Sequence, residues 1–395
     1  MQRLKIMPQQ YVFIVAYDGA RFHGWQRQHT NQNSTNDDIL PYKRPTIEGM
    51  RKRPRVDVST GERLPFTSLN YKNITVQDCL ECAILQWLST VTATASDNTN
   101  NPNDPSCWSL EDLNLRVAGR TDKGVHAKGQ VIAVQFPDTL PNRLEPWQIQ
   151  KGIHGRLPID ISIQRVYRHT TTTATLRPTT DATTSSVVDD LFDPRRDVKL
   201  KQYSYTIKYQ RQELVKYNDS TTASIPSVGA QTFRMALDDS PCLWSVHEPL
   251  NDHLLPKVCQ ELKGTHDYSV FVHKAARDEQ DNHLAITRFD FEVLHDYQAP
   301  TLYLLEDNDT VNSSNNNSNN RKNEPKIVLG RFIVEGQRFR RTMVRNLVGF
   351  AVDVARGKQS LESIASLWVS SKDGAGAPKI HSAPPTGLCL EFVKY

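Results

Sequence analysis

One short stretch of the chain combines the residue types that catalysis uses. Residues 116–127 read Arg-Val-Ala-Gly-Arg-Thr-Asp-Lys-Gly-Val-His-Ala, and their single carboxylate, Asp122, has three cationic or titrating neighbours: Arg120, Lys123 and His126. Positive neighbours favour the ionised form of a carboxylate. An ionised carboxylate suits nucleophilic or electrostatic work better than proton donation. A structural ion-paired loop would have the same composition, so spacing alone leaves both readings open.

Two strands are expected to hold this stretch in place. Residues 129–136 are mostly apolar and predict a strand directly after it. Residues 11–17 are aromatic and β-branched and predict a second, buried strand. That strand should end at Asp18-Gly19, a pair typical of turns.

A helix should follow further along the chain. Apolar residues recur at helical spacing from Val76 to Leu88, and Thr75 is the expected N-cap. Cys79 and Cys82 fall on the apolar face of this helix. Because a lone CxxC has no second ligand pair beside it, we interpret both cysteines as core residues and expect no metal site.

The second half of the chain shows the same kinds of signal. Residues 201–207 alternate as a strand does, which puts Tyr203 and Tyr205 on one face. Apolar residues between 344 and 355 form one face of a helix, and Gly357 is its expected stop.

Residues 118–127 closely resemble the AGRTDxGVHA signature of the TruA family of tRNA pseudouridine synthases. Further segments resemble other motifs of that family in the same order: YDGxxxxGWQRQ from Tyr17, SVQxxLexAL from Thr75, LPxDI from Leu157, FxxR followed by YxY from Phe192, GxHDFxxF from Gly264, FxxxMVRNxVG from Phe339 and APPxGLxL from Ala383. Two positions depart from the pattern: His154 stands where the family has Asn, and Thr342 where it has His before Met.

The resemblance implies a role for individual residues. Asp122 would be the catalytic nucleophile, and Arg120 would displace and hold the target nucleotide. Arg345 would pair with Asp122, and Tyr203 would pack against the target base, with Tyr205 as the reserve candidate. A tyrosine ring is a good platform for an extruded base. Two more residues of the matching motifs are expected to bind substrate: Arg27 and Leu388.

The resemblance also implies a fold and a reaction. The fold would be α+β, with two RRM-like halves whose antiparallel sheets flank a central cleft. The reaction would isomerise uridine to pseudouridine in the anticodon stem-loop of tRNA, at positions 38 to 40, after the base is flipped out of its stack. No oxidation occurs and no phosphate is consumed, so no cofactor and no metal are expected. The partners would be tRNA and a second copy of the chain in a homodimer.

Polar inserts interrupt this pattern. We expect an N-terminal α+β half at 8–168 with an insert at 30–72, a threonine-rich linker at 169–190, and a C-terminal α+β half at 191–395 with an asparagine-rich insert at 307–325. The first insert carries basic clusters at 43–44 and 51–55, which fit an RNA-binding loop, a nuclear address or a solvated segment.

Composition sets wide bounds. The chain has 395 residues and a net charge of +4, which is compatible with nucleic acid but weak evidence for it. Six scattered cysteines suggest a reducing compartment and argue against a disulfide framework. No apolar run reaches the roughly 20 residues that span a bilayer, so no membrane partner is expected. The first residues lack the apolar core of a secretory signal, which favours the cytoplasm or nucleus and leaves an organelle open.

Two further functions stay open on the sequence. A TruA-like synthase could act on other tRNA positions or other RNAs, and a noncatalytic RNA-binding protein could use the same fold. The motif residues Arg120, Asp122, Tyr203 and Arg345 argue against the noncatalytic alternative. His266-Asp267 could suggest an acid/base pair, but we interpret it as scaffold.

Overall fold

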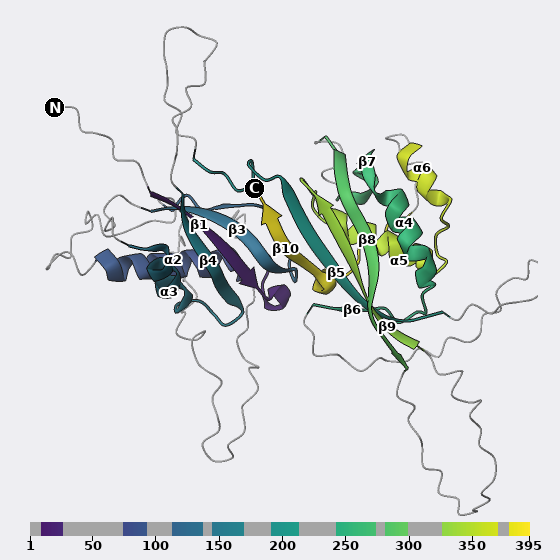
Figure 1. The fold of residues 1–395 in the computed structure, drawn as a ribbon, viewed down its shortest axis with the longest axis horizontal. Coiled ribbons are helices and arrows are strands. Elements are labelled where there is room, and N and C mark those ends of the chain that lie inside the picture. The colour runs from purple at the N-terminus through teal and green to yellow at the C-terminus, as the bar shows by residue number, and fades with distance from the viewer. Residues whose placement is uncertain are drawn as a thin grey trace, which may run out of the picture. The chain divides into compact units, whose positions relative to one another are not determined.

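The computed structural model describes nine segments of the chain: 9–26, 74–92, 113–136, 144–169, 191–212, 242–273, 281–298, 326–369 and 379–395. They form two compact units (Figure 1). Unit 1 comprises residues up to Lys201 together with Cys389–Tyr395, and unit 2 comprises Gln202–Leu388. Arg27, the basic clusters of the first insert and the asparagine-rich insert lie outside the described residues. The domain boundaries proposed from the sequence stay a prediction.

Unit 1 is built on a sheet whose strands run in the order β4-β1-β3-β10, with β2 also paired to β3. β1 is antiparallel to both β3 and β4, whereas β10 is parallel to β3. The elements are β1 (Gln9–Tyr17), α2 (Val76–Thr92), β2 (Arg116–Val117), β3 (His126–Phe136), α3 (Pro146–His154), β4 (Ile161–His169) and β10 (Leu388–Lys394).

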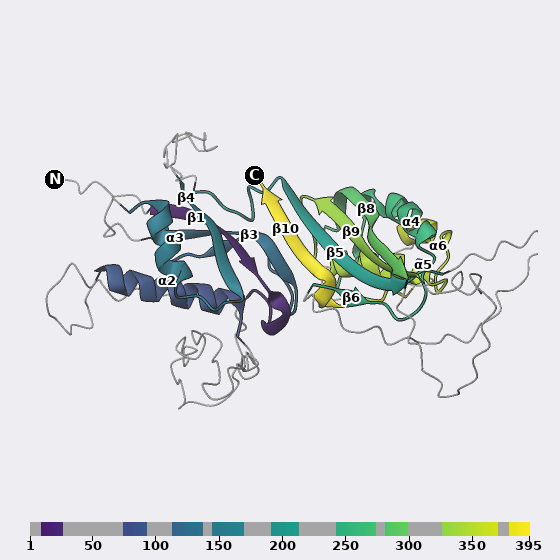
Figure 2. The ribbon, with the colours of Figure 1, turned by 60° about the horizontal axis from the view of Figure 1, so that its bottom comes forward.

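The core of unit 1 lies between the sheet and its two helices. Alternate residues of β1 are buried, among them Tyr11, Phe13 and Val15. Trp87 of α2 packs against Phe136 of β3, with ring centroids 5.6 Å apart. α3 packs against β4, and Figure 2 shows both helices beside this sheet. One face of the sheet is therefore sealed by apolar side chains, and the opposite face of β1 and β4 carries the less buried residues.

Unit 2 contains the strands β5, β9, β8 and β7, which are neighbours in that order, with β6 paired in parallel to β5. α4 packs against β8, and α5 packs against α4. The elements are β5 (Leu200–Gln210, its first two residues in unit 1), β6 (Trp244–Ser245), α4 (Leu255–Leu262), β7 (Gly264–Asp267), β8 (His283–Gln298), β9 (Lys326–Gly336), α5 (Met343–Ala355) and α6 (Ser363–Val369). Single 3-10 turns lie at Gly19–Arg21, Asp252–Leu254, Ser269–Phe271 and Pro385–Gly387.

The local predictions hold where the structure describes them. Helix α2 begins directly after Thr75, whose Oγ1 accepts from the Asp78 N–H at 3.2 Å while Asp78 Oδ2 accepts from the Thr75 N–H at 3.1 Å. This reciprocal cap satisfies two N-terminal donors of the segment. Cys79 and Cys82 are buried, as expected of core residues. Helix α5 stops before Gly357, which has a φ of 74° and donates to the carbonyl of Val354.

The α+β class is confirmed, but the expectation of purely antiparallel sheets is wrong. β10 lies parallel to β3, with Cys389 opposite His126, and β6 lies parallel to β5. Parallel neighbours need a long connection between them, and here β3 ends at Phe136 whereas β10 begins at Leu388, so that well over half of the chain lies between them. No local pattern in either strand encodes that pairing.

No helix within the described segments is both long and apolar enough to cross a membrane.

Replacing Gly349 of α5 with alanine should destabilise the protein. An added Cβ would lie 2.0 Å from the carbonyl oxygen of His381, so the helix or the neighbouring backbone must move. Overpacking of this kind costs about 1–3 kcal/mol, which should lower the midpoint of urea unfolding. Gly155→Ala is the matched control, because its Cβ would come no closer than 3.6 Å to another group and its φ of −64° suits alanine. Equal midpoints for both variants would contradict the close packing.

Candidate functional site

The signature loop, residues 118–125, connects β2 to β3 and carries Asp122. A buried hydrogen-bond cluster lies under it. The hydroxyls of Tyr17 and Thr121 are 2.8 Å apart, and Gln130 Nε2 donates to the carbonyl of Gly119 at 2.7 Å and to the Tyr17 hydroxyl at 3.4 Å. Burial raises the pKa of Tyr17, so its hydroxyl stays neutral and can donate. The loop is therefore tied to β1 and β3 through buried side chains.

Two glycines let the chain after β1 press against the backbone of the signature loop. At Gly19 an added Cβ would lie 1.9 Å from the Val125 carbonyl oxygen. Gly24 has a φ of 92°, and its added Cβ would lie 3.0 Å from the carbonyl oxygen of Thr121. The next residue, Trp25, donates its N–H to that same carbonyl at 3.0 Å. The Asp-Gly and Gly-Trp pairs of the first motif thus support the loop from one side, because only glycine fits such a close approach.

Asp18 and His126 form a titratable pair beside the loop. His126 Nδ1 lies 3.1 Å from Asp18 Oδ1 and 3.3 Å from the Gly19 nitrogen. A protonated Nδ1 donates to the carboxylate, whereas an unprotonated Nδ1 accepts from the Gly19 N–H. The hydrogen bond from His126 holds the pKa of Asp18 below its ordinary value, against the opposing effect of burial.

An open depression of about 540 Å³ adjoins this pair. Its lining comes from the end of β1, the start of β4 and the residues around them: Ala16, Tyr17, Asp18, Arg21, Ala127, Ile159, Asp160 and Ser162. Arg21 and Asp160 face each other at 3.6 Å. Tyr17 both lines the depression and bonds to Thr121 of the signature loop, so the two features share a wall.

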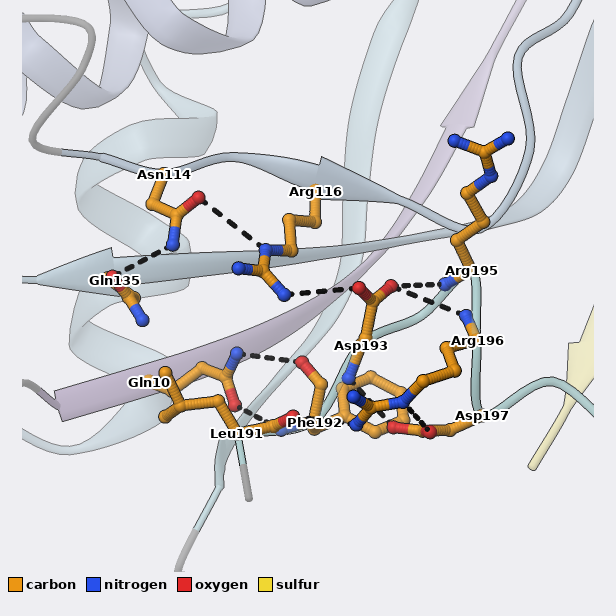
Figure 3. Close-up of polar contacts among 10 residues, drawn as sticks. All are labelled: Gln10, Asn114, Arg116, Gln135, Leu191, Phe192, Asp193, Arg195, Arg196 and Asp197. Carbon is orange, nitrogen blue, oxygen red and sulfur yellow. Dashed lines mark hydrogen bonds and ion pairs between the residues drawn. The ribbon is translucent and has the colours of Figure 1, made fainter. Parts of the chain in front are cut away.

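A turn at residues 191–197 braces β2 from another side (Figure 3). Arg116 Nη1 pairs with Asp193 Oδ2 at 3.1 Å, and the other carboxylate oxygen, Oδ1, accepts from the N–H of Arg195 at 2.9 Å. Gln10 of β1 bonds to both backbone groups of Phe192, at 2.8 and 3.1 Å. The Arg at the start of the signature stretch and the Asp of the FxxR motif therefore meet in unit 1.

The charged residues of the loop differ in exposure. Asp122 is half-buried, while Arg120 and Lys123 are exposed. The Asp122 carbonyl accepts from the Val125 N–H at 3.2 Å, and Gly124 has a φ of 80°. A tight turn therefore fixes the backbone on which the carboxylate is mounted.

Arg345 and Leu388 lie in unit 2, near the C-terminal motif. Arg345 of α5 donates from Nε to the carbonyl of Ala383 at 2.7 Å, and the Ala383 N–H donates to the Arg345 carbonyl at 3.1 Å. Tyr205 is fully buried and donates to the carbonyl of Pro384 at 2.6 Å. Leu388 is buried at the start of β10. The MVRN helix and the APPxGL segment thus form one support for Arg345.

Tyr203 and Tyr205 share one strand face but differ in surroundings. Tyr203 is 8% exposed and packs edge-to-face on Phe339, with centroids 5.2 Å apart and planes at 83°. Tyr205 has no exposed surface and packs against Trp244. We therefore assign Tyr205 to the core, and Tyr203 stays the candidate for contact with a base.

Other residues singled out from the sequence have structural surroundings. His266 stacks on Trp368 with centroids 4.1 Å apart, and Asp267 accepts from the Ser269 N–H at 3.0 Å, in agreement with a scaffold role. His154 Nδ1 accepts from the Ile163 N–H at 3.2 Å, so this departure from the family pattern makes its own contact with β4. In the part of the chain that the structure describes, no group of three or more His, Cys, Asp or Glu side chains could hold a metal.

Sequence reasoning missed two residues that support the loop. Gln130 is fully buried in β3, and Lys201 is 8% exposed and donates from Nζ to the carbonyl of Ala118 at 2.7 Å. The only sequence feature that could have indicated them is a polar residue within a predicted strand. Arg120 and Asp122 belong to unit 1, whereas Tyr203, Arg345 and Leu388 belong to unit 2. The pairing of Arg345 with Asp122 stays a prediction.

Comparisons with known proteins agree on one enzyme class. A family model described as tRNA pseudouridine synthase matches residues 258–395. The chain is 28% identical over 306 residues to tRNA pseudouridine synthase A of Myxococcus xanthus, covering 74% of this chain and 84% of that protein. It is 26% identical to the proteins of the same name from Thermosipho africanus, over 72% of this chain and 84% of the relative, and from Chlamydia trachomatis serovar L2b, over 72% and 77%.

Asp18→Asn should lower stability near neutral pH and lose this effect in acid. The pKa of Asp18 lies below its ordinary value of 3.8 in the folded protein, so the ionised carboxylate stabilises the fold above that value. The contribution disappears as pH falls through the folded pKa. We expect the gap in urea midpoint between wild type and variant to close as the pH falls below about 4. Asp290→Asn, which alters a half-exposed ion pair with Arg288, is the control. A gap independent of pH would contradict the electrostatic origin.

Proposed function

Because the chain belongs to the TruA family of tRNA pseudouridine synthases, and is therefore an isomerase, we propose that it isomerises uridines of the tRNA anticodon arm with Asp122 as nucleophile. The main support for this proposal is that buried contacts hold the signature loop in one position. Its backbone is held by Tyr17, Gln130 and Gly24, so the carboxylate of Asp122 sits on a fixed turn. Preorganised groups lower a barrier most, because little reorganisation remains when the reaction occurs.

The reaction breaks the N1–C1′ bond of uridine, turns the uracil and joins C5 to C1′. Atoms and electrons balance within the substrate, so the protein need only hold, activate and reposition it. The ionised Asp122 can attack C1′, attack C6 of the ring, or stabilise a cleaved glycal intermediate. All three routes need an ionised carboxylate next to the nucleoside.

The substrate base must leave its stack before it reaches Asp122. Extrusion costs a few kcal/mol, which contacts in the pocket and to phosphates must offset. Arg120 is exposed on the signature loop, and we assign to it the place that the base vacates. Tyr203 would cover the flipped base, and Arg345 would pair with Asp122. Leu388 and Arg27 complete the proposed substrate contacts, Arg27 lying outside the described residues.

We take the arrangement of the halves, the oligomeric state and the modified positions from the TruA family. The two compact units correspond to the two RRM-like halves, and the enzyme acts as a homodimer on tRNA. The modified uridines are those at positions 38 to 40. Inserts that the bacterial family pattern lacks leave other tRNA positions or other RNAs as the second candidate. Mapping pseudouridines in total RNA treated with the protein separates these two.

Asp122→Asn should abolish pseudouridine formation and leave tRNA binding nearly intact. Removing a nucleophile should cost more than the roughly 10²-fold to 10⁴-fold typical of a lost general acid or base. The measurements are single-turnover pseudouridine formation and filter binding of the same tRNA. Asp290→Asn, on an exposed strand position of β8, is the control and should react as wild type. Turnover of Asp122→Asn within tenfold of wild type would exclude Asp122 as the nucleophile.

Arg345→Lys should strongly reduce turnover while tRNA affinity changes little. Lysine keeps the charge but loses both the planar fork that matches a carboxylate and the Nε contact with Ala383. Arg331→Lys is a matched control, because Arg331 also contacts a carboxylate, that of Glu292, on the surface of unit 2. If Arg345→Lys reacts normally at saturating tRNA but binds tRNA weakly, Arg345 belongs to the RNA-binding surface instead.

A further inference from the structure

Within the described segments, no helix covers one face of the unit 1 sheet along β1 and β4. On the sealed face, Phe13 opposite Val166 and Val15 opposite Ile163 are buried. The opposite face, here called the open strip, consists of three cross-strand pairs: Val12 with Tyr167, Ile14 with Arg165, and Ala16 with Ser162. The pairing register shifts by one residue between the second and third pair. The three β1 residues are partly exposed, and Arg165 and Tyr167 are exposed.

The centre of the open strip is an exposed arginine–tyrosine pair. Tyr167 leaves 43% of its surface exposed. Arg165 Nη1 donates to the Tyr167 hydroxyl at 3.1 Å, and its guanidinium carbon lies 5.9 Å from the ring centroid. Among the described residues Arg165 contacts no carboxylate. An exposed tyrosine face and a guanidinium plane are the groups on which unpaired bases stack, and the guanidinium can also bind phosphate.

The two ends of the strip strengthen this reading. At one end Ala16 and Ser162 line the depression beside the signature loop, into which exposed Arg21 also projects. At the other end Gln10 holds the 191–197 turn, which carries the exposed Arg195 and Arg196 (Figure 3). The strip from Ser162 to Tyr167 is about 16 Å long at roughly 3.3 Å per residue, enough for a few stacked nucleotides.

We propose that the open strip binds an unpaired stretch of the substrate tRNA, with a base stacked on Tyr167 and a phosphate held by Arg165. This rests on the proposed function, because it places the RNA on a surface that leads to the Asp122 loop. A second copy of the chain is the competing occupant. A twofold contact centred on this strip would bring two Arg165 side chains together without a carboxylate partner between them, which disfavours it.

The test compares variants of two equally exposed strand tyrosines. Tyr167→Ala removes the stacking ring, Tyr167→Phe keeps it, and Tyr297→Ala on β8 is the control, at 44% exposure. The readout is the Kd for full-length tRNA and for a short single-stranded RNA, by fluorescence anisotropy. Loss of one stacked base should weaken binding of both RNAs about tenfold for Tyr167→Ala, whereas the other two variants stay within about twofold.

Two further measurements distinguish the contributions of the Tyr167 ring and the Arg165 charge to binding from an effect on the reaction itself. Arg165→Gln should lower the slope of log K against log salt by about 1, as expected when one phosphate contact is lost. The single-turnover rate at subsaturating tRNA should fall for Tyr167→Ala in proportion to its lost affinity, whereas Tyr297→Ala should leave that rate unchanged.

Several outcomes would overturn the inference. The first is an unchanged Kd for Tyr167→Ala, and the second is an equal loss of RNA affinity for Tyr297→Ala. The third is a change in the oligomeric state of Tyr167→Ala in sedimentation while its RNA affinity is preserved, which would assign the strip to contact with a second copy of the chain. If the proposed function itself is wrong, the wild-type protein will form no pseudouridine. The Kd values of the variants would still show whether RNA binds to the open strip.

Discussion

The arrangement of unit 1 depends on the buried hydrogen bonds between Tyr17, Thr121 and Gln130. Each of these polar groups would cost about 1–3 kcal/mol if buried without a partner, so the three must be satisfied together or not buried at all. Because they lie on β1, the signature loop and β3, satisfying them fixes the loop against two strands. A glycine-containing loop of a few residues is thereby held in one position, as a preorganised functional site requires.

In unit 2 a functional segment is also held in place, but by backbone contacts and not by a buried cluster of polar side chains. Gly349 lets the segment at His381 approach α5, and Arg345 and Ala383 then exchange hydrogen bonds. Gly387 packs on the Tyr205 ring, whose hydroxyl holds Pro384. Two motifs far apart in sequence therefore act as one support.

Local features of this fold could be predicted from the sequence, and pairings between distant segments could not. Thr75 caps α2 and Gly357 ends α5 because capping depends on residues within one turn. The parallel partner of β3 could not be foreseen, since strand pairing depends on the whole chain. The support by Gln130 and Lys201 was equally hidden, because both donate to backbone carbonyls that any residue could supply. Tyr203 and Tyr205 look alike in sequence and are distinguished only by what covers them.

The most direct test of the account is pseudouridine mapping of unmodified tRNA incubated with the purified protein and nothing else. The account predicts new pseudouridines in the anticodon arm, formed without cofactor or energy source. A folded protein that binds the tRNA but leaves every uridine unchanged would contradict the claim that the buttressed Asp122 loop is a catalytic site.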